Sequence, residues 1–165
     1  DHFARATDTL AAGPVHRNFQ GYTTDTGAAL IGLGASAIGR LPQGYVQNAV
    51  PTAEYTRRIE AEGLAAARGR VLTADDRARG YVIETLLCKL RFSAGDTRDQ
   101  FGAAGAALAD IGKSVIDSDE DGLVDPEGGD GSFRVTEKGR LFLRSICACF
   151  DAYLGTGKAT HAAGV

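Results

Sequence analysis

Leu30-Ile31-Gly32-Leu33-Gly34-Ala35-Ser36-Ala37-Ile38 is a short apolar run that is rich in small residues and closed by Gly39. A run of this kind predicts a buried strand, and its glycines indicate a close approach of another part of the backbone. Strands that are buried on both faces belong in parallel sheets, and the rest of the sequence offers too few strands to build one. We therefore expect this segment to belong to a sheet that continues outside the chain.

The composition sets the broad class of protein. The 165 residues are 44% hydrophobic and 24% charged, with a formal net charge of −3. This balance is ordinary for a soluble protein, and it gives no long-range attraction to nucleic acid or anionic lipid. No apolar run approaches the roughly 18 residues that a membrane helix needs, and no basic-then-apolar leader indicates secretion. We expect a cytoplasmic monomer with no nucleic-acid or membrane partner.

The sequence contains no methionine, so Asp1 is not a translational start. Either a leader was removed or the chain is a fragment of a longer protein, and we expect a fragment because the opening residues lack leader character. The cysteines, Cys88, Cys147 and Cys149, are odd in number and no secretory signal accompanies them. This usage is typical of reduced thiols in the cytosol, and we interpret each cysteine as a small buried hydrophobic residue.

The middle of the chain predicts two helices. Thr52 is the expected cap of the first helix, which carries Tyr55, Ile59 and Leu64 on one side and ends at Gly69. The segment 73–76 resembles a capping box with acids in the first turn, where the helix dipole favours them. Apolar residues then follow at helical spacing and predict one buried face: Val82, Ile83, Leu86, Leu87 and Leu90.

Two short helices, a hairpin and a last helix are predicted beyond residue 95. Each glycine in a helix interior costs about 1 kcal/mol relative to alanine, so the glycines between 95 and 112 favour two helices over one long one. Leu123-Val124 and Phe133-Arg134-Val135 flank a glycine-rich loop and predict a hairpin. Thr136 caps the last helix, whose expected buried residues are Leu141, Phe142, Ile146, Cys149, Phe150 and Tyr153. Together these elements predict an α+β fold with a mostly helical, winged-helix-like domain over residues 71–154.

Three possible binding sites each lack part of the residue pattern that the site needs. Residues 117–122 match the first half of a calcium loop, but the twelfth position is Gly128 where a bidentate Glu is needed. Cys147 and Cys149 point to different sides of a helix, and His2, His16 and His161 have no ligand spacing. The expected recognition helix of a winged-helix module, residues 103–116, holds Lys113 as its one base. We expect no metal site, and a stand-alone winged-helix binding module stays the alternative function.

Several strings of residues carry a resemblance to a known family. In chain order they are 1–5 (DHFAR), 16–24 (HRNFQGYTT), 32–38 (GLGASAI), 45–48 (YVQN), 122–125 (GLVD), 135–140 (VTEKGR) and 146–151 (ICACFD). The chain thereby resembles the carboxy-terminal third of the oxygen-independent coproporphyrinogen III oxidases. The string Asn18–Thr24 is the most specific of these matches.

The resemblance implies a radical enzyme of haem biosynthesis that uses S-adenosylmethionine and a [4Fe-4S] cluster. Such enzymes oxidatively decarboxylate two propionates of coproporphyrinogen III to vinyl groups, which gives protoporphyrinogen IX. The implied domains are the end of a radical-SAM (β/α) barrel at 1–50, a connecting helix at 51–70, a cap domain at 71–154 and a flexible tail at 155–165. The family's Cys-x-x-x-Cys-x-x-Cys motif is absent from this sequence. Because a cluster needs thiolate ligands, we expect this chain alone to bind no cofactor and to be inactive.

The resemblance also implies site residues. Phe19, Gln20 and Ile38 are similar to residues that line the region of S-adenosylmethionine and substrate in that family. Gln20 offers an amide that can orient a polar group, while Phe19 and Ile38 offer apolar walls that keep water from a radical. No catalytic residue is assigned. Possible partners of substrate carboxylates, since arginine forks onto carboxylates, are Arg40, Arg57, Arg58, Arg140 and Arg144.

Overall fold

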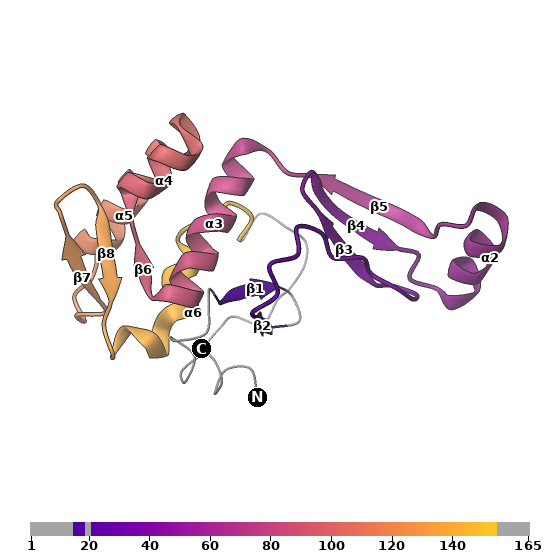
Figure 1. Cartoon of the computed structure of the whole chain (residues 1–165). Coiled ribbons are helices and arrows are strands. Elements are labelled where there is room, and N and C mark those ends of the chain that lie inside the picture. The colour runs from indigo at the N-terminus through magenta and orange to yellow at the C-terminus, as the bar shows by residue number, and fades with distance from the viewer. Residues whose placement is uncertain (1–14, 19–20, 155–165) are drawn as a thin grey trace. The chain divides into compact units, whose positions relative to one another are not determined.

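The structure is a computed structural model that describes residues 15–18 and 21–154 (Figure 1). The expectations for Phe19, Gln20, His2, His161 and the tail from residue 155 lie outside these residues. The fold is α+β, as predicted, and it divides into two compact units. The first unit comprises the chain up to Thr24 together with Ala74 onward, and the second comprises Asp25–Thr73. No helix in the described part of the chain is long and apolar enough to cross a membrane.

The first unit packs helices against a small antiparallel sheet. Its helices are α3 (Ala74–Lys89), α4 (Ala94–Phe101), α5 (Ala103–Asp117), the 3₁₀ turn η1 (Gly139–Phe142) and α6 (Leu143–Ala148). The strands β6 (Arg91–Phe92), β7 (Val124–Glu127) and β8 (Ser132–Val135) pair in the order β6-β8-β7. A separate hairpin of β1 (His16–Asn18) and β2 (Gly21–Thr23) completes the unit.

Three phenylalanines form the centre of this unit's core. The ring of Phe92 lies 5.5 Å from that of Phe133 and 5.1 Å from that of Phe150, in tilted geometries. Tilted pairs at this spacing are favourable beyond the area that they bury. Val82, Leu86 and other residues of α3 pack against this cluster, and burying each such side chain contributes about 1.5–3 kcal/mol. The predicted buried face of α3 is therefore confirmed.

The break between α4 and α5 falls at Gly102, so the prediction of two short helices is confirmed. Gly102 has φ 58° and ψ −130°, a backbone conformation that costs glycine little. Gly105 then allows the two helices to approach closely, because a Cβ at this position would overlap the Thr97 carbonyl oxygen. The predicted hairpin is also confirmed, as β7 and β8 with their glycine-rich turn.

The second unit is a three-stranded antiparallel sheet with one helix. Its elements are β3 (Ile38–Leu41), β4 (Gly44–Asn48), α2 (Thr52–Glu62) and β5 (Ala66–Val71), and the strand order is β3-β4-β5. Within Asp25–Thr73 the buried hydrophobic residues are Ala49 and Ala65, and every residue of β5 is exposed. A unit of this size with so small a core lacks the buried apolar area on which independent stability rests.

The expectation of a buried strand in a parallel sheet at Leu30–Ile38 is wrong. Leu30 forms a single bridge with Arg40, after which the chain turns through Gly34 and Ser36 at positive φ. The side chains of Ile31 and Leu33 are 67% and 85% exposed. A buried strand needs a paired neighbour along its length and cover on its faces, whereas pairing here is limited to the Leu30–Arg40 bridge. The predicted close approach of backbone is present at Gly32, where a Cβ would lie 2.8 Å from the Ile38 carbonyl carbon.

Two other helix predictions are wrong in part. The first helix ends at Gly63, whose N–H donates to the Ile59 carbonyl, and Gly69 lies inside β5, because residues 66–71 pair with β4. Thr52 provides no side-chain cap. The last helix is interrupted, with η1 preceding α6. The Thr136 hydroxyl accepts from the Gly139 N–H at its start, and Ile146 and Phe150 are buried as predicted, but the remaining four predicted buried residues are exposed: Leu141, Phe142, Cys149 and Tyr153.

Candidate functional site

The β1–β2 hairpin carries the most specific string of the sequence. Asn18 pairs with Gly21 and His16 pairs with Thr23 in an antiparallel register. Phe19 and Gln20 connect the paired ends in the sequence, although they lie outside the described residues. β1 and β2 are therefore the described elements that flank these two candidate site residues in the sequence.

Helix α3 holds the hairpin through polar contacts on both strands. The Glu84 carboxylate accepts from the His16 ring nitrogen Nδ1 at 3.0 Å, and the Arg17 backbone N–H reaches the same oxygen at 3.4 Å. On the other strand, the Tyr22 hydroxyl donates to the Leu87 carbonyl at 3.2 Å. The Arg17 guanidinium lies 5.6 Å from the centre of the Tyr22 ring, within the range of a cation–π contact. No sequence pattern indicated these contacts with α3, since they join residues more than sixty positions apart.

The hairpin packs over a region where ionisation is disfavoured. Burial raises the pKa of Tyr22 above its ordinary value, and the charge of Arg17 offsets part of that effect. Burial also raises the pKa of the Cys88 thiol to about 11 and that of the Cys147 thiol to about 12. A thiolate is the form that binds metal or attacks an electrophile. These two cysteines are therefore inert, and Cys147 behaves as the predicted buried hydrophobic residue.

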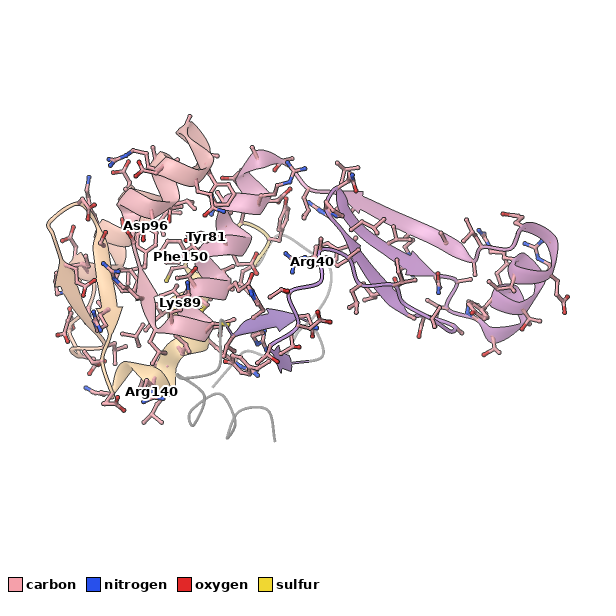
Figure 2. The ribbon with its side chains drawn as sticks, viewed as in Figure 1. Arg40, Tyr81, Lys89, Asp96, Arg140 and Phe150 are labelled. Atoms are coloured by element: carbon pink, nitrogen blue, oxygen red, sulfur yellow. The ribbon has the colours of Figure 1, made fainter. Side chains whose placement is uncertain are left out.

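Ile38, the third predicted site residue, belongs to the other unit. It opens β3 and is 39% exposed, so its apolar side chain is available for contact. Its partner across the strand pair is Gln47 on β4, and Arg40 follows two positions later on the same face. Figure 2 labels Arg40 on this sheet.

The other predicted carboxylate partners differ in their availability. Arg57 and Arg58 both bind Glu54 on α2, at 2.7 and 2.6 Å, and this pairing lowers the pKa of Glu54 to about 2, with Arg57 as the main cause. Arg140 pairs with Glu137 at 3.0 Å. Arginines that are already paired in this way offer less to a ligand than Arg40 does.

The acidic segment is a structural turn. The Asp119 carboxylate accepts from the N–H groups of Leu123 at 2.9 Å and Val124 at 2.8 Å. Partial burial would raise the pKa of Asp119, but these backbone donors outweigh it and lower the pKa. Because both carboxylate oxygens bind the protein's own backbone, they are not arranged to bind calcium. Among the described residues no group of three His, Cys, Asp or Glu side chains could hold a metal ion.

A small cavity of about 110 Å³ lies where α3, β6 and α4 meet. Tyr81, Lys89 and Asp96 are among its lining residues, and Figure 2 labels all three. Its charges are mixed, so it favours no one class of ligand. On α5, Lys113, the one base of the expected recognition helix, lies 3.2 Å from Asp110.

The fold is shared with part of a known enzyme. A solved structure of coproporphyrinogen III oxidase from Escherichia coli, a radical SAM enzyme, matches with a TM-score of 0.79 and 36% identity. The match covers 90% of this chain and 34% of that chain. The chain thus has the fold of one portion of a radical SAM enzyme. No protein-family model matches it.

Curated relatives identify which enzymes these are. The oxygen-independent coproporphyrinogen III oxidase of Bradyrhizobium diazoefficiens is 43% identical over all of this chain and 37% of its own length. The enzyme of the same name from Escherichia coli K12 is 41% identical over 93% of this chain and 34% of its own length. The chain corresponds in sequence and fold to the carboxy-terminal portion of the oxygen-independent coproporphyrinogen III oxidases, as the resemblance predicted, and spans about a third of their length.

Proposed function

We propose that this chain is the carboxy-terminal part of an oxygen-independent coproporphyrinogen III oxidase. The whole enzyme would oxidatively decarboxylate two propionates of coproporphyrinogen III to vinyl groups in haem biosynthesis, in the cytoplasm. The observation that carries this proposal is the agreement of two comparisons over nearly the whole chain, at 43% identity with a curated oxidase and at a TM-score of 0.79 with a solved one.

The residues of this chain do not fit the iron–sulfur cluster. Such a cluster needs at least three cysteine thiolates at one place, whereas no group of three possible ligands is found among the described residues and burial keeps the Cys88 and Cys147 thiols protonated. The cluster would therefore belong to the rest of the enzyme. This chain would contribute Phe19, Gln20 and Ile38 to the walls of the S-adenosylmethionine and substrate region.

The finer architecture follows from the same proposal. We propose that residues 1–50 contribute to the end of the enzyme's (β/α) barrel and that residues 71–154 form a winged-helix-like cap. Residues 51–70 would connect these two parts. The small core of the second unit supports packing against other residues of the enzyme. The order α3, β6, α4, α5, β7, β8 supports the winged-helix comparison, and the similarity to oxidases over nearly the whole chain disfavours a stand-alone DNA-binding module.

An anaerobic activity assay tests the proposal. The complete enzyme that contains this chain is reconstituted with iron and sulfide, supplied with S-adenosylmethionine, and its porphyrin products are separated by chromatography. We expect the complete enzyme to form the two-vinyl product and the 165-residue chain to form none. Conversion by the 165-residue chain, or failure of the complete enzyme to consume coproporphyrinogen III, would contradict the proposal.

A further inference from the structure

One face of the β3–β4–β5 sheet gathers side chains that suit a carboxylate ligand. Directly paired residues of antiparallel strands share a face, and so do residues two apart on one strand. The register pairs Arg40 with Tyr45 and Tyr45 with Arg70 in one row, and it pairs Ile38 with Gln47 and Gln47 with Arg68 in the next. We call this set the arginine face: Ile38, Arg40, Tyr45, Gln47, Arg68 and Arg70.

The opposite face has a different character. Gly39, Val46 and Gly69 form the row that alternates with the arginine face. The chain from Leu30 onward approaches this side so closely that a Cβ at Gly39 would lie 2.9 Å from the Leu30 carbonyl oxygen. The three arginines project from the other face, and all three are exposed.

The charges of Arg40 and Arg68 are not neutralised within the unit. In the described part of the chain, no hydrogen bond or ion pair joins the side chain of either arginine to another group. The arginines of α2 behave differently, since Arg57 and Arg58 share Glu54. Arg40 and Arg68 project from the same face of the sheet, and two such positive charges in a chain of net charge −3 favour an anionic ligand.

The apolar members of the face narrow the class of ligand. Tyr45 and Ile38 are 36% and 39% exposed and lie beside the arginines. Arg40 on β3 and Arg68 on β5 are two strand spacings apart across the sheet, which is about 10 Å. A flat ligand with an apolar body and several carboxylates at its rim would cover Tyr45 and Ile38 while its carboxylates reach the guanidinium forks on either side.

We propose that the arginine face binds propionate carboxylates of the porphyrinogen substrate, with Arg40 and Arg68 as the principal partners. This inference rests on the proposed function, and it adds the residues that would hold the substrate's carboxylates. Arginine suits the task because its planar fork makes two parallel hydrogen bonds to one carboxylate and stays charged at all physiological pH values. The face would therefore set the orientation of the substrate beside Ile38.

Equilibrium binding to the complete enzyme tests the assignment. The probes are coproporphyrin III, the stable oxidised form with the same propionates, and its uncharged tetramethyl ester, both followed by fluorescence anisotropy. In the double variant Arg40→Gln and Arg68→Gln, the Kd for coproporphyrin III should rise by about tenfold or more, since each lost bond to a charged group is a large effect. Binding of the ester should change little, because it has no carboxylate for the arginines to hold.

Matched variants separate a lost contact from a folding defect. Arg98→Gln removes an exposed arginine of α4 that lies 3.8 Å from Asp99, and it should leave the Kd within about twofold. The pair Arg40→Lys and Arg68→Lys keeps the charges and should give an intermediate Kd, because an ammonium lacks the fork. Unchanged binding of coproporphyrin III by the double glutamine variant, or an equal loss for the ester, would overturn the assignment.

The two proposals can fail separately. An enzyme that converts coproporphyrinogen III with an unchanged KM in the double glutamine variant would refute the arginine face and leave the proposed function standing. If the unmodified enzyme converts nothing but binds coproporphyrin III, and the double glutamine variant loses that binding, the proposed function is refuted and the carboxylate site is supported.

Discussion

The anchoring of the β1–β2 hairpin on α3 leads to a quantitative prediction. The hydroxyl hydrogen bond from Tyr22 to the Leu87 carbonyl, at 3.2 Å, should contribute about 1 kcal/mol. The contact of His16 with Glu84 is partly exposed, at 41% and 27% of the two side chains, so about 0.5 kcal/mol remains after solvent screening. Removing both contacts, with Tyr22→Phe and Glu84→Ala, should make detachment of the hairpin easier by about 1.5 kcal/mol, or about tenfold.

Limited proteolysis reports this detachment. Trypsin cleaves after Arg17, which lies in β1, and cleavage tracks the open population when opening is fast. Mass spectrometry should show cleavage at Arg17 about tenfold faster in the double variant, while Glu137→Gln, which alters only the exposed pair with Arg140, should match the unmodified chain. An unchanged cleavage rate in the double variant would refute the anchoring role of α3.

Two further predictions concern the first unit. Gly80→Ala on α3 has open space around the new Cβ and should stabilise the chain by about 0.5–1 kcal/mol in urea denaturation. Gly105→Ala would place a Cβ against the Thr97 carbonyl oxygen and should destabilise the chain by about 1–3 kcal/mol in the same assay. Equal effects of the two substitutions would contradict the close packing of α4 on α5. Asp119 has a lowered pKa in the folded chain, so its stabilising effect is present above its unfolded pKa of about 3.9 and is lost as the pH falls through the folded pKa. Asp119→Asn should therefore weaken the chain at neutral pH and flatten its loss of stability in acid, and an identical acid transition in both proteins would count against this role.

The first unit could be predicted well because its signals are local. The apolar residues of α3 recur at helical spacing, a glycine separates α4 from α5, and turn residues mark the β7–β8 hairpin. Each of these patterns depends on residues that lie close together in the sequence. The first unit also buries its apolar residues against its own elements, so that periodicity and burial agree.

The second unit could be predicted only poorly, for a physical reason. Its strands bury little, so the apolar pattern does not mark them, and the run Leu30–Ile38 predicts a strand that the chain does not form. Because the first helix was predicted to extend to Gly69, Arg68 and Arg70 were not included among the possible carboxylate partners. The alternation of Arg68, Gly69 and Arg70 was the available signal, since strict alternation indicates a strand with two different faces.

The candidate site could be predicted by resemblance more than by physics. Ile38 is placed on an exposed strand, whereas Phe19 and Gln20 stay predictions. The contacts of Glu84 and Tyr22 that hold the hairpin were not foreseen, because nothing in a single sequence pairs a residue of a short hairpin with a distant helix.

Hydrogen exchange of the amides in Ala66–Val71 tests most directly whether the second unit is built to be completed by other residues. All six residues of this strand are exposed, so we expect their amides on the free edge to exchange rapidly in the 165-residue chain and to become strongly protected in the complete enzyme. Equal protection of this strand in both proteins would mean that the sheet is already complete, and it would contradict a second unit that depends on the rest of the enzyme.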